Sequence, residues 1–76
     1  MEKFFMWYYG TRLGKALRYG DYDKAAKVMD QCIRHRARYT KRSYADTQNG
    51  MLACYEDDDD IEFRNMATIY RQKYCK

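Results

Sequence analysis

Apolar residues recur at three- and four-residue steps through most of this chain, and no proline interrupts them. The clearest example begins at Tyr22, where one face of a helix would carry a continuous apolar stripe made of Tyr22, Ala25, Ala26, Met29, Cys32 and Ile33. A period of 3.6 residues is typical of an amphipathic helix that packs one face against a core. The pattern therefore predicts an all-α protein.

The length of the chain limits how large that core can be. Its 76 residues make at most one domain, and we predict a single helical domain over residues 1–76. Hydrophobic residues make up 46% and charged residues 34%, which excludes disordered and collagen-like classes. The apolar run Phe4–Tyr9 is far shorter than the about 20 residues of a membrane span. Three cysteines are an odd number, which argues against a secreted disulfide scaffold, so we expect a cytoplasmic protein.

Three principal helices are predicted, and the first two form a helical hairpin. The first covers roughly Glu2 to Tyr19. Gly20 ends it, because glycine readily adopts the left-handed conformation that closes a helix. Asp21 or Asp23 then caps the second helix by accepting hydrogen bonds from its first amide groups.

A local resemblance supports the hairpin. The turn and second helix of a tetratricopeptide repeat resemble one stretch of this chain, Gly20-Asp21-Tyr22-Asp23-Lys24-Ala25 with Met29, Cys32 and Ile33 after it. Such repeats need about three stacked copies to bury a continuous core, and a second copy is absent here. The resemblance implies a helical hairpin and not membership of that family.

The end of the second helix is ambiguous in the sequence. It stops near Tyr39 or continues almost to Asn49-Gly50, the next pair of residues that breaks helices. Met51–Tyr55 then has the composition of a short strand as well. We expect a long or bent second helix followed by an irregular or extended segment near residues 44–56.

The third helix is predicted from both of its ends. Asp57 to Asp60 place negative charge at its positive N-terminus, where Asp59 and Glu62 have capping-box spacing. Arg71, Lys73 and Lys76 lie near the negative C-terminus, where cations are favoured. Its apolar stripe consists of Phe63, Met66, Ala67, Tyr70 and Tyr74.

Positive charge is concentrated in the middle of the chain. The net charge is +4, and no acidic residue occurs from Gln31 to Ala45. At about 100° per residue, six cations fall within roughly 100° of one another, provided that the second helix continues to Arg42. We call them the basic stripe: Lys24, Lys27, Arg34, Arg38, Lys41 and Arg42. We predict that this stripe meets an acidic protein surface or phosphates.

A solvated, salt-bridged face is the alternative interpretation of the basic stripe. Asp23 precedes Lys27 by four residues and Asp30 precedes Arg34 by four, which is the favourable order for salt bridges within a helix. The acidic segment 56–60 offers further neutralisation by folding back onto the stripe. The partners of these carboxylates decide how much positive charge stays available.

Aromatic residues are frequent, particularly near the N-terminus. They make up 17% of the chain, and the run Phe4–Tyr9 points around the whole circumference of the first helix. Some of these rings should therefore face outward, and Tyr and Trp are enriched at protein interfaces. We predict that Phe5, Trp7 and Tyr8 anchor a partner, with self-association through the same rings as an alternative.

No residue pattern favours catalysis, a cofactor or a metal. His35 is the single histidine and lies between two arginines, which disfavours its protonation, so we expect it at the surface. Cys32, Cys54 and Cys75 lack the paired spacing of zinc sites. The acidic run lacks the alternating carboxylates and central glycine of a calcium loop. We expect no catalytic residue, no cofactor, no metal and no enzyme activity.

Binding is the function that remains. We expect a small non-enzymatic interaction protein that docks on a larger protein with an acidic surface, as an inhibitor or adaptor. The alternative is a nucleic-acid-binding protein that uses the basic stripe on phosphates. In size, tyrosine richness and want of catalytic motifs, the chain resembles the small accessory proteins of bacteriophages that modify host machinery. No membrane partner is expected.

Overall fold

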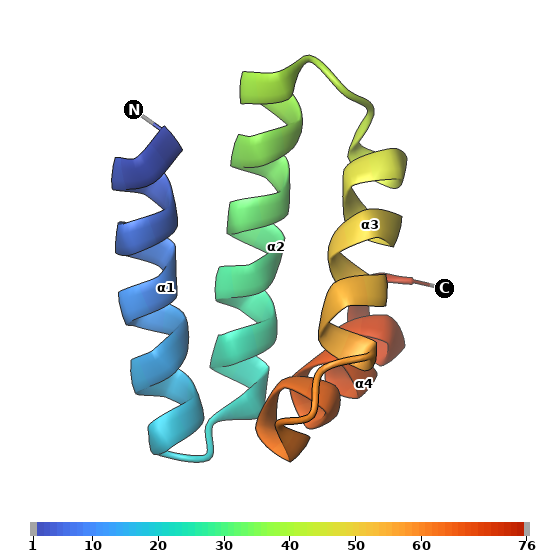
Figure 1. Ribbon diagram of the computed structural model, residues 1–76. Coiled ribbons are helices and arrows are strands. Elements are labelled where there is room, and N and C mark those ends of the chain that lie inside the picture. The colour runs from blue at the N-terminus through green and yellow to red at the C-terminus, as the bar shows by residue number, and fades with distance from the viewer. Residues whose placement is uncertain (1, 76) are drawn as a thin grey trace.

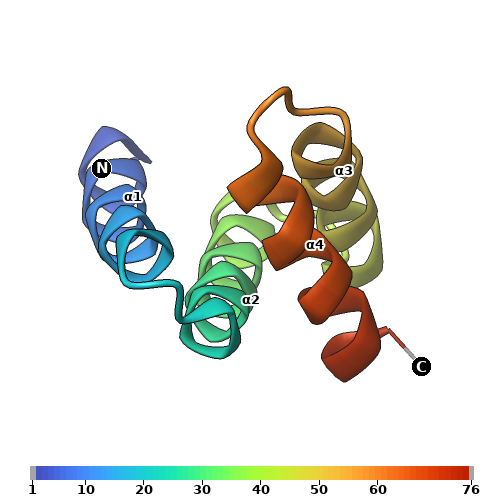
Figure 2. The same ribbon diagram turned by 90° about the horizontal axis from the view of Figure 1, so that it is seen from below.

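The computed structural model of the protein describes the backbone of residues 2–75 and the side chains of residues 8–75. Over this range the chain forms four α-helices: α1 (Glu2–Arg18), α2 (Tyr22–Thr40), α3 (Tyr44–Glu56) and α4 (Ile61–Tyr74). The first three lie side by side with α2 in the middle, and α4 crosses the ends of α2 and α3 (Figures 1 and 2). The predicted all-α class is confirmed.

The prediction of three principal helices is wrong, because residues 44–56 form a helix and not an irregular or extended segment. Lys41 adopts a left-handed conformation with φ of 58°, and the Arg42 amide donates to the Ala37 carbonyl at 3.0 Å, which closes α2. Ser43 then caps α3 by accepting a hydrogen bond from the Asp46 amide at 3.1 Å. Three residues that do not look like helix breakers, Lys41, Arg42 and Ser43, therefore separate α2 from α3.

Asn49 and Gly50 lie inside α3, although their pairing suggested a break. Glycine costs a helix roughly 1 kcal/mol relative to alanine. Packing offsets this cost, since the Leu52 side chain is fully buried against the other helices. Tertiary contacts, and not local propensity, keep this segment helical.

The other helix ends match the sequence more closely. Gly20 has φ of 71° and its amide donates to the Leu17 carbonyl at 3.0 Å, so it terminates α1 as predicted. Asp21 caps α2 by accepting from the Lys24 amide at 3.1 Å. The cap of α4 is Asp60 and not Asp59, because Asp60 accepts from the Glu62 amide at 2.9 Å.

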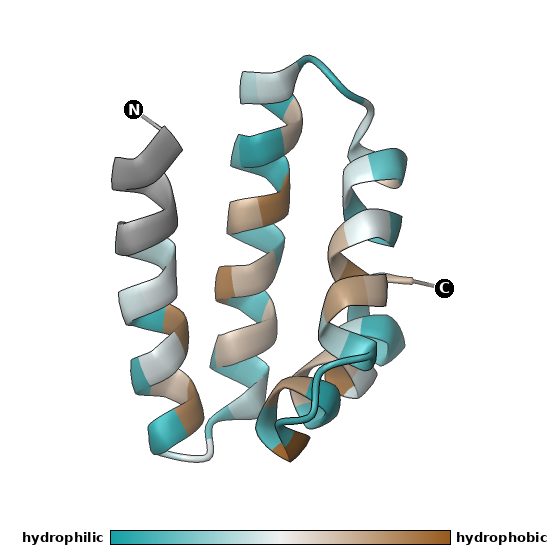
Figure 3. Cartoon of the chain, in the orientation of Figure 1, coloured by the Kyte–Doolittle hydropathy of each residue, from teal (hydrophilic) through white to brown (hydrophobic). Residues whose placement is uncertain are grey.

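The core forms around α2, which is buried along a wide arc. Facing sides of α1 and α2 carry hydrophobic residues (Figure 3), and α3 and α4 cover the other flank of α2. The α1 residues Leu13, Ala16 and Leu17 are buried. The largest fully buried side chains come from α2, α3 and α4: Tyr70, Met29, Ile33, Leu52, Met66 and Val28. No helix within residues 2–75 is long and apolar enough to cross a membrane.

Two isoleucines provide a matched test of this core. Ile33 is fully buried, whereas Ile61 is 61% exposed at the start of α4. Ile33→Ala should lower the free energy of unfolding by about 2–5 kcal/mol, because it removes buried methyl groups and leaves a cavity. Ile61→Ala should change it by about 0.5 kcal/mol at most. Urea unfolding followed by circular dichroism measures both, and equal effects would contradict the described packing.

Candidate binding surface

The basic stripe follows the exposed side of α2. Lys24, Lys27, Arg34 and Arg38 belong to the helix and are exposed. The six cations were placed on one helix face on the condition that the helix continues to Arg42. This condition is not met, because α2 ends at Thr40. Lys41 forms the left-handed cap and Arg42 follows it, and both are exposed. The stripe therefore consists of four helical cations and two cations in the α2–α3 connection.

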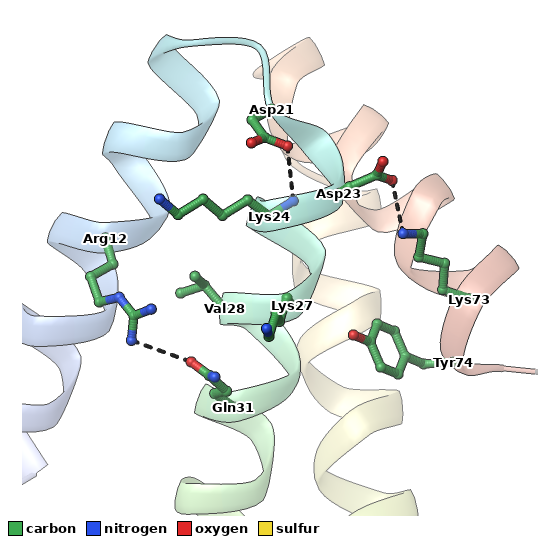
Figure 4. A pocket seen from close by; sticks show the side chains of 9 residues that line it. All are labelled: Arg12, Asp21, Asp23, Lys24, Lys27, Val28, Gln31, Lys73 and Tyr74. Atoms are coloured by element: carbon green, nitrogen blue, oxygen red, sulfur yellow. Dashed lines mark hydrogen bonds and ion pairs between the residues drawn. The ribbon is translucent and has the colours of Figure 1, made fainter.

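The N-terminal half of the stripe lines an open cleft of about 480 Å³ between α1, α2 and α4 (Figure 4). Arg12 enters it from α1, while Lys73 and Tyr74 enter it from α4. Lys24 and Lys27 lie between them on α2. We call this space the basic cleft.

Most of the stripe is not neutralised by the protein itself. Asp23 pairs with Lys73 of α4 at 3.1 Å and not with Lys27, so that expected helix salt bridge is wrong. Glu56 binds Arg71 of α4 through hydrogen bonds of 2.6 and 2.9 Å. Within residues 8–75, no described ion pair involves five of the six cations of the stripe, Lys24, Lys27, Arg38, Lys41 and Arg42.

Arg12 adds a cation that the sequence analysis missed. Its Nη1 donates to Gln31 Oε1 of α2 at 3.3 Å, and its guanidinium lies 5.5 Å from the centre of the Tyr8 ring. The spacing of Tyr8 and Arg12 places them on one side of α1. The sequence gives no sign, however, of which side of α1 faces the exposed edge of α2.

Of the three predicted aromatic anchors, the described side chains include that of Tyr8. Tyr8 is 42% exposed, and its ring packs edge-on against Tyr9 at 5.3 Å. The side chains of Phe5 and Trp7 lie outside the described residues. The anchoring role of all three stays a prediction.

Arg34 is the one helical cation of the stripe with a described carboxylate partner, and that partner is buried. Asp30 is 7% exposed, and its Oδ2 accepts a hydrogen bond from Arg34 Nε at 2.8 Å, which confirms the predicted salt bridge. Its Oδ1 accepts from the hydroxyls of Tyr44 of α3 and Tyr70 of α4, the latter at 2.9 Å. Gln48 Nε2 of α3 donates to the Tyr70 hydroxyl at 2.9 Å. We call these five residues the Asp30 network.

The network keeps the Asp30 carboxylate ionised. Burial by itself raises the pKa of Asp30, but hydrogen bonds from Arg34, Tyr44 and Tyr70, with the Arg34 charge, outweigh it and lower the pKa from its ordinary value. Burial and the hydrogen bond to Asp30 raise the pKa of Tyr70 well above its ordinary value. An ionised carboxylate and protonated tyrosines therefore persist through the neutral pH range. The polar groups of the network are hydrogen-bonded to one another.

His35 does not lie at the surface as expected. It is half-buried, and its Nδ1 lies 3.0 Å from the Tyr9 hydroxyl of α1. Its two arginine neighbours in sequence, Arg34 and Arg36, are exposed. His35 thus joins α1 to α2. Among the described residues, no group of three or more His, Cys, Asp or Glu side chains is arranged to hold a metal ion.

Comparisons with known proteins add no assignment. No protein-family model matches the chain, and neither a curated protein nor a solved structure shows significant similarity to it. The function is therefore argued from the charges and contacts described above.

The Asp30 network predicts a loss of stability in acid. Because the pKa of Asp30 is lower in the folded chain than in the unfolded chain, the unfolded chain takes up a proton first as the pH falls. The stabilisation is complete above about pH 5 and declines as the pH falls through about 4 towards the folded pKa. Urea unfolding from pH 7 to pH 2 measures it.

Asp30→Asn should lower the free energy of unfolding at pH 7 by about 1–3 kcal/mol and flatten this acid decline. Asp59→Asn is the matched control, because Asp59 is exposed in the α3–α4 loop, and it should retain the wild-type profile. Parallel profiles for the wild type and Asp30→Asn would contradict a buried, ionised Asp30.

Proposed function

We propose that this protein is a non-enzymatic binding protein of the cytoplasm that docks on a larger protein with an acidic surface, as an inhibitor or adaptor. The observation that carries the proposal is the basic stripe, because five of its six cations have no described carboxylate partner within residues 8–75. The carboxylates of Asp23 and Glu56 are held by α4 instead.

The length of the stripe suits a macromolecular partner. From Lys24 to Arg38 it extends about 21 Å, at 1.5 Å per residue of helix. Uncompensated charge over such a length accelerates association with an acidic surface and disfavours basic partners. Apolar anchors at the centre of an interface supply most of the affinity, and this role is assigned to Phe5, Trp7 and Tyr8.

Nucleic-acid binding is the second candidate, and exposed tyrosines favour it. Tyr39 on α2 is 52% exposed and Tyr19 after α1 is 75% exposed. Aromatic rings beside cations can stack on bases while the cations contact phosphates. In that case the affinity for single strands would fall with salt concentration. A plot of log affinity against log salt concentration would have a slope of about −0.7 for each phosphate contact.

Charge reversal at matched positions tests the proposal. Arg38 and Arg64 are both exposed arginines in helices, but Arg64 lies on α4 outside the basic stripe. Arg38→Glu should reduce capture of the partner from a nuclease-treated lysate of the source cells by about tenfold or more, because it places a negative charge in the stripe. Arg64→Glu changes the net charge equally and should leave capture within about twofold. Quantitative mass spectrometry measures both.

Two outcomes would contradict the docking function. Equal losses with Arg38→Glu and Arg64→Glu would show that net charge, and not the stripe, governs capture. Loss of all capture on nuclease treatment, with wild-type protein retaining short single strands at low salt, would support the nucleic-acid candidate in its place.

A further inference from the structure

The basic cleft is lined by hydrogen-bond donors, because its own carboxylates are already occupied. Asp21 Oδ1 accepts from the Lys24 backbone amide at 3.1 Å, and Asp23 Oδ1 binds Lys73 Nζ at 3.1 Å (Figure 4). Neither carboxylate is paired with the ammonium group of Lys24 or of Lys27 among the described residues. These two ammonium groups keep their donors available to a ligand.

Gln31 turns its amide nitrogen away from α1. An arginine can only donate, so the 3.3 Å contact fixes Gln31 Oε1 towards Arg12 Nη1. The Gln31 amide nitrogen then points elsewhere, and none of the described hydrogen bonds gives it an acceptor. Arg12 is held in place by the same contact and by the Tyr8 ring.

Four side chains therefore bring donors to one cleft from two helices, and we call them the donor cluster: Arg12, Lys24, Lys27 and Gln31. They surround Val28, which is 1% exposed and forms the apolar floor of the cleft. This floor offers no polar side-chain group to a ligand. With Lys73, Asp21 and Asp23 counted as well, the four cations and two carboxylates of the lining give the cleft a net charge of +2, which favours an anionic ligand that accepts several hydrogen bonds. A phosphate monoester has three terminal oxygens and a charge near −2, whereas a carboxylate has two oxygens and a charge of −1.

We propose that the basic cleft binds the phosphate group of a phosphorylated side chain on the partner protein. This inference rests on the proposed docking function for its partner, and the donor cluster supplies its chemistry. Arg12 offers paired guanidinium donors, and the two lysines add compact charges.

The cleft favours an isolated phosphate over a nucleic-acid strand. Asp21 and Asp23 also line it, at the end where α2 begins. Asp23 is paired with Lys73, but Asp21 has no cation partner among the described residues, so a continuous chain of phosphates entering the cleft would be repelled by it. A single phosphate on an otherwise uncharged peptide segment meets the donor cluster without that cost.

Peptide binding to the full chain tests the inference. The probes are a short blocked peptide with a central phosphoserine, the same peptide with serine, and a 5′-phosphorylated single-stranded trinucleotide. Amide and side-chain chemical shifts of the ¹⁵N-labelled protein measure binding. We expect saturable shifts centred on Arg12, Lys24 and Gln31 with the phosphopeptide, and none with the serine peptide.

Variants locate the site. Arg12→Met removes the charge, retains the apolar stem and should weaken phosphopeptide binding by about tenfold or more. Arg12→Lys should recover part of this loss, because it restores the charge without the paired donors. Lys41→Met removes a cation of the stripe that does not line the cleft, and should change binding by about twofold at most.

Three results would overturn the inference: no saturable shifts with the phosphopeptide, equal weakening by Arg12→Met and Lys41→Met, or tighter binding of the trinucleotide than of the phosphopeptide. The docking function fails separately. If the phosphopeptide binds but Arg38→Glu leaves partner capture unchanged, the phosphate site in the cleft is supported and the docking function of the basic stripe is contradicted. If capture depends on Arg38 but no phosphopeptide binds, the docking function is supported and the phosphate site is contradicted.

Discussion

A single buried carboxylate, that of Asp30 on α2, forms the hydrogen bonds that link α2 to α3 and α4. Removing an ion from water is costly, and Asp30 is tolerated inside because Arg34, Tyr44 and Tyr70 all donate to it. These contacts connect α2 to α3 and α4 across 14 and 40 residues of sequence. In α3 they add to the packing of the buried Leu52 and of Met51 and Tyr55, which lie against the core. Hydrogen bonds that are satisfied only in one arrangement therefore define how α3 and α4 pack on α2.

The same network shapes the outer surface of α2. Asp30 neutralises Arg34 alone, since its other oxygen faces the tyrosines. The remaining nearby carboxylates serve the fold, with Asp21 capping α2 and Asp23 and Glu56 held by α4. Acidic residues thus stabilise helix ends and helix packing, and the cations on α2 are left for other contacts. Structure and proposed function are linked through this division of charge.

The sequence predicts what is local and misses what depends on packing. The caps at Gly20 and Asp21 and the apolar stripes of α2 and α4 follow from spacing and propensity. Helix α3 was missed because Ser43 is an ordinary polar residue until its side chain caps a helix, while Asn49-Gly50 looks like a break. Arg12 and His35 were missed for another reason. Their partners, Gln31 and Tyr9, lie 19 and 26 residues away, and no local pattern encodes such pairings.

The most direct test of this account is a double-mutant cycle between α2 and α4. Asp30→Asn, Tyr70→Phe and the double variant are unfolded in urea at pH 7, and the coupling energy is calculated from the three changes in free energy. A hydrogen bond between a buried carboxylate and the Tyr70 hydroxyl predicts that the two losses fail to add by about 1 kcal/mol or more. Additivity to within about 0.5 kcal/mol would contradict a network centred on Asp30.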